Sequence, residues 1–132
     1  MTKRILWLFT LIAYITSLFF PALYGGGTYL DGVTLLLYGW AKTLDGQCYA
    51  WLANPIFFAA FIFFILSRFK IAAGISLLAF LIGLDTFRAT RFPPNEAYTV
   101  AIDAVGPAFY IWMASFIFLA LASLYLAWAD AT

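Results

Sequence analysis

The ionisable residues that could support chemistry begin at Asp85, which ends a charge-free window at residues 71–84. A carboxylate at the edge of an apolar segment is a candidate for a proton or cation relay. Arg88 follows three positions later, which is the spacing of an ion pair on one helix face. A relay usually needs a second buried charge, and the other long apolar segments contain none. We therefore expect Asp85 and Arg88 to pair and to end a helix.

Arg91 and Asp103 complete the set of candidate functional polar residues. Arg88 and Arg91 are spaced to bind phosphates or carboxylates, and anchoring at lipid headgroups is the common role of such arginines. Asp103 and Glu96 lie in the same segment. General acid–base catalysis needs two carboxyl groups at a fixed separation, and the acidic residues show no such spacing. We expect a protein that is not an enzyme.

The composition excludes most other chemistry. The chain has no His and one Cys, Cys48, so the usual metal and haem ligand sets, His-dependent nucleophilic catalysis and an internal disulfide are not available. The glycine run at 25–27 lacks the Lys and Ser or Thr of a phosphate-binding loop. A net charge of +1 provides no dense basic patch for nucleic acid. We expect no cofactor, no metal and no nucleic-acid partner.

The elements that position these residues are apolar enough for a membrane. Hydrophobic residues make up 66% of the 132 positions and charged residues 10%, against roughly a quarter charged in soluble proteins. A helix needs about 20 mostly apolar residues to cross a bilayer. The sequence predicts an all-α, polytopic membrane protein with one domain over residues 1–132 and four transmembrane helices. The expected spans are residues 5–23, 51–67, 71–87 and 107–128.

The basic residues predict the orientation of these spans. Lys3 and Arg4 precede the first span, and Arg68 and Lys70 lie between the second and third. Cytoplasmic segments carry an excess of Lys and Arg close to the helix ends. We expect both termini to be cytoplasmic, in a bacterial inner membrane, with the connections on the other side facing out.

The first span also has the charged start and the small residues of a signal peptide. Its apolar stretch is longer than usual, and the bulky residues Phe19, Phe20, Leu23 and Tyr24 precede the possible cleavage site. We therefore expect a retained anchor that ends at Pro21 and the glycine run.

Two outer connections follow from this topology. In the first, apolar residues recur on one helical face, and Asp31 and Gly46 suit the two helix ends, which predicts an amphipathic helix at residues 32–45. It is too short to cross and is expected to lie on the outer interface; a re-entrant loop lining a pore is the alternative. In the second, Pro93 and Pro94 exclude a helix. Residues 98–105 form either a strand-like cover or an early start of the fourth span.

Small residues predict which helix faces pack together, because they let backbones approach closely in lipid. The candidate packing residues are Ala72, Ser76, Ala79 and Gly83 in the third span and Ala108, Ser115, Ala122 and Ala129 in the fourth. The second span is expected to begin at Asn54, as N-cap, and Pro55. Its phenylalanines point to all sides, so part of it is expected to face lipid or a partner.

In size and number of expected spans the chain looks like the four-helix inner-membrane immunity proteins that protect bacteria from pore-forming toxins. This likeness covers topology and no residues, and topology alone does not establish function. The sequence favours a non-catalytic protein that acts by binding within the membrane, as such a protector or as an accessory subunit of a larger complex. Its expected partners are the lipid bilayer and another membrane protein or a second copy. The alternative is a small oligomeric channel or transporter unit.

Overall fold

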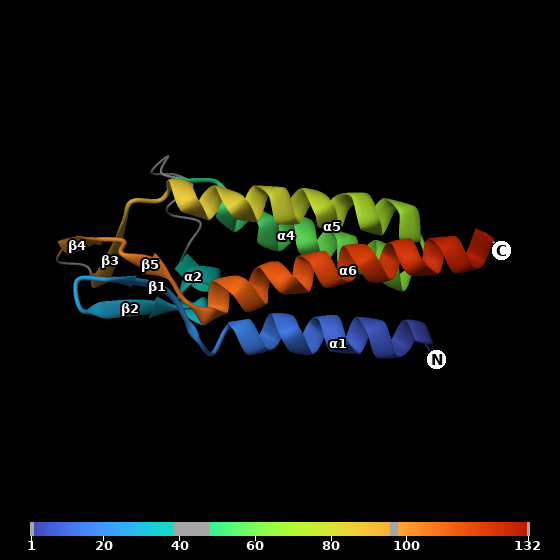
Figure 1. Cartoon of the computed structure of the whole chain (residues 1–132), viewed down its shortest axis with the longest axis horizontal. Helices are drawn as coiled ribbons and strands as arrows, with labels where there is room; N and C mark the ends of the chain where they lie inside the picture. The colour runs from blue at the N-terminus through green and yellow to red at the C-terminus, as the bar shows by residue number, and fades with distance from the viewer. Residues whose placement is uncertain (1, 39–47, 96–97, 132) are drawn as a thin grey trace.

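The computed structural model describes residues 2–38, 48–95 and 98–131 of the chain. These residues are mostly helical and contain five α-helices, which confirms the predicted predominance of helix. The prediction of an all-α fold is wrong, because two small antiparallel sheets cover one end of the helices (Figure 1). Trp40, Ala41, Lys42, Leu44, Asp45, Gly46 and Glu96 lie outside the described residues.

Four long helices form the body of the molecule. They are α1 (Thr2–Ser17), α4 (Ala53–Ile65), α5 (Phe69–Gly83) and α6 (Pro107–Ala131). Helix α5 packs between α4 and α6, and α1 packs against α6 (Figure 1). Among the described residues, two helices are long and apolar enough to cross a membrane, Phe69–Arg88 and Pro107–Ala129. Ala50–Ile65 is also an apolar helix but is shorter.

The first helix is shorter than the predicted span at residues 5–23, because α1 ends at Ser17. Pro21–Gly25 forms strand β1 instead, and Pro21 has no N–H with which to continue a helix. Strand β1 pairs antiparallel with β2 (Thr28–Asp31) and with β5 (Ala104–Val105). Gly26 and Gly27 have φ of 60° and 76°, the positive values that a tight hairpin turn needs. The glycine run therefore turns a hairpin at the end of the bundle.

The connection between α5 and α6 is a strand-like cover. Strand β3 (Arg91–Asn95) pairs antiparallel with β4 (Tyr98–Ala101), and α6 begins later, at Pro107. The two sheets touch at Gly25, where a Cβ atom would lie 2.1 Å from the carbonyl oxygen of Ala101. We refer to the two sheets together with α2 as the β cap.

Helix α2 (Gly32–Tyr38) begins where the sequence predicts the amphipathic helix. The backbone N–H of Thr34 donates to Asp31 Oδ1 at 3.0 Å, so Asp31 is the N-cap, as predicted. The predicted remainder of this helix lies outside the described residues.

The end of the bundle opposite the β cap gathers basic residues. Helices α4 and α5 form an antiparallel hairpin around Ser67, whose φ is 61°. Lys3 Nζ donates to the carbonyl oxygen of Ile65 at 2.6 Å and to Ser67 Oγ at 2.8 Å. Helix α1 begins and α6 ends at this same end (Figure 1). Lys3, Arg4, Arg68 and Lys70 therefore share one end of the molecule, which we call the basic end.

The core is packed in two ways. Between α5 and α6 small residues allow close approach: Ser76 Oγ donates to the carbonyl oxygen of Phe116 at 2.6 Å, and both residues are fully buried. Between α1 and α4 aromatic rings keep the helices further apart, with Tyr14 stacked on Phe57 at 5.1 Å and Trp7 edge-on to Phe61 at 5.9 Å.

Candidate functional site

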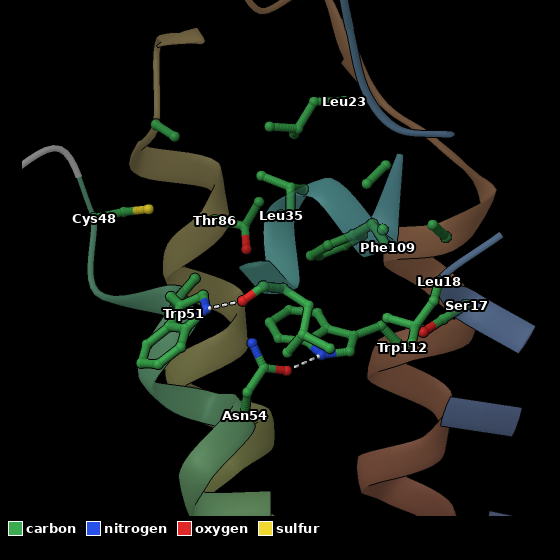
Figure 2. A pocket seen from close by; sticks show the side chains of 16 residues that line it. Ser17, Leu18, Leu23, Leu35, Cys48, Trp51, Asn54, Thr86, Phe109 and Trp112 are labelled. Carbon is green, nitrogen blue, oxygen red and sulfur yellow. Dashed lines mark hydrogen bonds between the residues drawn. The ribbon is translucent and has the colours of Figure 1, made fainter. Parts of the chain in front are cut away.

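A cavity of about 90 Å³ lies where the helices meet the β cap. Its walls come from the end of α1, strand β1, helix α2, the start of α4 with the short helix η1 (Ala50–Leu52), the helix η2 (Leu84–Arg88) and the start of α6. The lining is largely apolar, with the rings of Trp51, Phe109 and Trp112 and the side chains of several leucines (Figure 2). We refer to this hollow as the cap cavity.

Asn54 lines the cap cavity and joins three helices. Its Oδ1 accepts a hydrogen bond from the Tyr14 hydroxyl at 2.7 Å and another from Trp112 Nε1 at 2.9 Å (Figure 2 shows the second). These donors belong to α1 and α6, whereas Asn54 belongs to α4. The side chain is only 6% exposed, so a buried polar cluster ties α1, α4 and α6 together beneath the cavity.

The orientation of the Asn54 amide is fixed by its partners. An indole N–H can only donate, so the amide atom that faces Trp112 must be the oxygen. The amide nitrogen then points away from the two donors and into the cavity (Figure 2). Within the described part of the chain, this nitrogen has no hydrogen-bond acceptor. A buried donor without an acceptor is uncommon and costly in a folded protein.

Among the described residues of the cavity wall, the other side-chain O–H and N–H donors already have acceptors. Ser17 Oγ donates to the carbonyl oxygen of Tyr14 at 2.5 Å, and Thr86 Oγ1 donates to that of Gly83 at 2.7 Å. Trp51 Nε1 donates to the carbonyl oxygen of Leu36 at 2.9 Å, which ties α2 to the bundle. The remaining thiol, that of Cys48, is free and buried, and a thiol is only a weak donor.

Asp85 and Arg88 form an ion pair at the edge of the cap. The Arg88 Nε group contacts Asp85 Oδ1, and Arg88 Nη2 donates to Asp85 Oδ2 at 2.9 Å. The backbone N–H of Tyr49 also donates to Asp85 Oδ2 at 2.6 Å, a contact that the sequence does not predict. The Arg88 guanidinium lies 5.6 Å from the centre of the Tyr49 ring. The pair thus connects η2 to the segment that precedes η1.

The structure separates the other two candidate polar residues from this pair. Arg91 is the first residue of β3, and Asp103 is exposed between β4 and β5. The Asp103 backbone N–H donates to the carbonyl oxygen of Tyr24, so this segment is held by main-chain pairing with β1. Asp85 and Arg88 are brought into direct contact, as the sequence predicts.

The candidate packing residues lie inside the bundle. Ala72, Ser76, Ala79, Gly83, Ala108, Ser115 and Ala122 are all buried. A Cβ atom at Gly83 would lie 2.5 Å from Met113 Sδ on α6. Ser115 Oγ donates to the carbonyl oxygen of Trp112 at 2.6 Å, and Ala108 lines the cap cavity. These small residues therefore hold the bundle together from within.

Asn54 is the functional candidate that the sequence analysis misassigns. It is predicted as the N-cap of the second span, but α4 begins at Ala53, and its N-cap, Leu52, makes no side-chain hydrogen bond. An amide in an otherwise apolar window is a signal that could have identified a buried role, because polar side chains in membrane helices usually face the bundle interior. The hydrogen-bond partners of Asn54 could not be identified, because nothing in the sequence shows that Tyr14 and Trp112 lie next to it in the fold.

Among the described residues, no group of three or more His, Cys, Asp or Glu side chains could hold a metal ion. Comparisons of this chain with protein-family models, with curated proteins and with solved structures found no match. The fold and the site define a mostly helical protein with two helices able to cross a membrane, a β cap and a largely apolar cavity beneath it.

Proposed function

We propose that this chain is a multi-pass inner-membrane protein of bacterial type, in which all four long helices cross the bilayer. It acts by binding another membrane protein, as a protector against a pore-forming toxin or as an accessory subunit. The observation that carries this proposal is the apolar outer surface of the bundle. Exposed large apolar side chains occur on every long helix, among them Ile5, Phe9 and Ile12 of α1, Phe58, Ile62 and Ile65 of α4, Ile71, Leu77 and Leu81 of α5, and Leu121, Leu124 and Trp128 of α6.

A surface of this kind suits lipid and not water. Soluble monomers rarely expose contiguous apolar patches larger than a few hundred Å². In a bilayer the same side chains contact acyl chains, and the helical backbone satisfies its own hydrogen bonds. Helices α1 and α4 are short for a ~30 Å core, but local thinning of the bilayer accommodates short spans at modest cost.

The bundle interior supports binding over conduction by a single chain. Phe57, Phe64, Phe116 and Leu119 are fully buried in the core cluster, where a channel would need a polar or water-filled path. A channel built from this protein would therefore have its pore between copies. The small residues of α5 and α6 are already used inside the bundle, so a partner helix would meet larger side chains on the outside.

Helices α1 and α4 offer the surface that best suits a partner helix. They lie at the two ends of the packing order, and rings such as Tyr14 and Phe57 hold their backbones apart. Among the described helices, α1 packs closely against α6 alone and α4 against α5 alone.

Photo-crosslinking in membranes tests the proposal. A photoreactive phenylalanine analogue at Ile12 or Ile62 should give a discrete protein adduct, because these exposed positions lie on α1 and α4. The same analogue at the exposed Leu78 of α5 is the matched control and should give mainly lipid adducts. Ion flux through purified protein in liposomes, or equal adducts at all three positions, would contradict the binding role; flux would instead support the channel alternative.

A further inference from the structure

We propose that the cap cavity binds a neutral, largely apolar molecule that presents one hydrogen-bond acceptor, of the ketone carbonyl type, to Asn54 Nδ2. This site is separate from any protein partner on the outer faces of α1 and α4, and its test does not depend on that partner. The inference rests on three features of the described part of the cavity: an unused donor, a lining without charged side chains, and a volume that suits a small ligand.

The unused donor determines which end of a bound ligand faces Asn54. Asn54 is 6% exposed, its oxygen is occupied by Tyr14 and Trp112, and its nitrogen has no acceptor within the described residues. The nitrogen cannot exchange places with the oxygen, because Trp112 has no acceptor to offer it. A ligand oxygen would remove the cost of leaving this donor unpaired.

The lining determines that the ligand is neutral and apolar. Among the described residues that line the cavity there is no Asp, Glu, Lys or Arg. A charged ligand would lose its hydration without gaining a partner. The rings of Trp51, Phe109 and Trp112 provide flat apolar contacts for the body of a ligand (Figure 2).

The volume favours an organic ligand over ordered water. A cavity of about 90 Å³ has the volume of roughly three water molecules in the liquid. A buried water usually makes about three hydrogen bonds, and among the described lining residues Asn54 Nδ2 is the one strong side-chain donor left for it, because those of Ser17, Trp51 and Thr86 are engaged. An enclosed apolar cavity of about 150 Å³ stays dry and takes up benzene. The cap cavity is smaller but partly open, so the body of a larger ligand can extend out of it.

The binding test uses two probes of nearly equal shape. Acetophenone carries a carbonyl oxygen, and α-methylstyrene has a CH₂ group in its place. Both are titrated by ligand-observed NMR into the full-length protein in lipid nanodiscs, with empty nanodiscs as the correction for partition into lipid. We expect saturable binding of both, with acetophenone bound roughly threefold to tenfold more tightly, the range expected from one net hydrogen bond.

Two variants connect the binding to the cavity. Ala108→Leu fills the cavity wall and should abolish saturable binding of both probes, whereas Ala114→Leu, the same change at an exposed position of α6, should leave it unchanged. Asn54→Ala should retain binding of α-methylstyrene and lose the preference for acetophenone. Equal affinity of the two probes for the unmodified protein, no saturable binding, or binding that survives Ala108→Leu would each overturn the proposal.

Discussion

Asn54 and Asp85 both lie near the β cap, but their surroundings differ. Asn54 is buried and satisfies two donors from other helices, Tyr14 and Trp112. Asp85 lies at a helix end and pairs with Arg88, which is largely exposed. Exposed ion pairs contribute little to stability, whereas an unpaired buried donor loses its hydration without compensation. At the scale of single residues, the neutral amide is therefore the more important polar group.

This difference predicts opposite outcomes for two substitutions. Asn54→Ala removes the oxygen that accepts from both the Tyr14 hydroxyl and the Trp112 N–H and should lower the free energy of unfolding by about 2 kcal/mol. Asp85→Asn keeps a carbonyl oxygen for the Tyr49 N–H and should leave unfolding close to wild type. Unfolding in mixed micelles by increasing denaturing detergent measures both.

If Asp85→Asn is present at the normal level but no longer binds its protein partner or protects against a toxin, this carboxylate has a role beyond its ion pair with Arg88 at the helix end. Asp103→Asn, a change at an exposed position outside the ion pair, provides the control for the loss of one negative charge.

At the scale of elements, the contact between α5 and α6 depends on small residues on one face of each helix. Gly83 faces Met113 and Trp112, whereas Gly74, on the same helix, has no atom within 4 Å of a Cβ built on it. Both glycines lie in α5, so a comparison of the two isolates the effect of packing against α6.

Gly83→Leu should destabilise the bundle by about 1–3 kcal/mol, because the new side chain must displace Met113 and Trp112. Gly74→Leu should be neutral or stabilising, since Leu has the higher helix propensity and open space surrounds this site. The unfolding assay and the membrane abundance of each variant provide the measurement. Equal effects of the two substitutions would contradict the α5–α6 packing.

At the scale of the whole molecule, the basic end and the β cap lie at opposite ends of the helices (Figure 1). Lys3 contacts the α4–α5 turn directly, so the start of α1 and this turn lie at the same end of the molecule. The proposed orientation places the basic end in the cytoplasm, in accordance with the distribution of Lys and Arg. Cys48 cannot report on this orientation, because its thiol is buried.

Labelling of introduced cysteines in a Cys48→Ser background tests the orientation. Tyr29→Cys in strand β2 and Leu66→Cys beside the α4–α5 turn replace exposed residues at opposite ends. A membrane-impermeant maleimide should label the first in intact cells and the second only after lysis. The reverse pattern would invert the topology, and labelling of both in intact cells would show that the helices do not cross the membrane.

The sequence by itself determined the features that depend on neighbouring residues. The charge-free windows predict the long helices, Asp31 caps α2, Gly106 and Pro107 begin α6, and Asp85 pairs with Arg88 three positions away. These outcomes follow from hydrogen bonding, backbone freedom and apolar content within a few residues of each position.

Only the tertiary structure decided the β cap and the role of Asn54. Strand β1 lies in an apolar window that also suits a helix, and it pairs with β5, about 80 positions later in the chain. Asn54 has the residue type of an N-cap, and its partners Tyr14 and Trp112 lie 40 and 58 positions away. The cap cavity in turn needs the ends of three long helices, α2 and the β cap to converge. Such contacts depend on how distant elements pack, which local residue preferences do not specify.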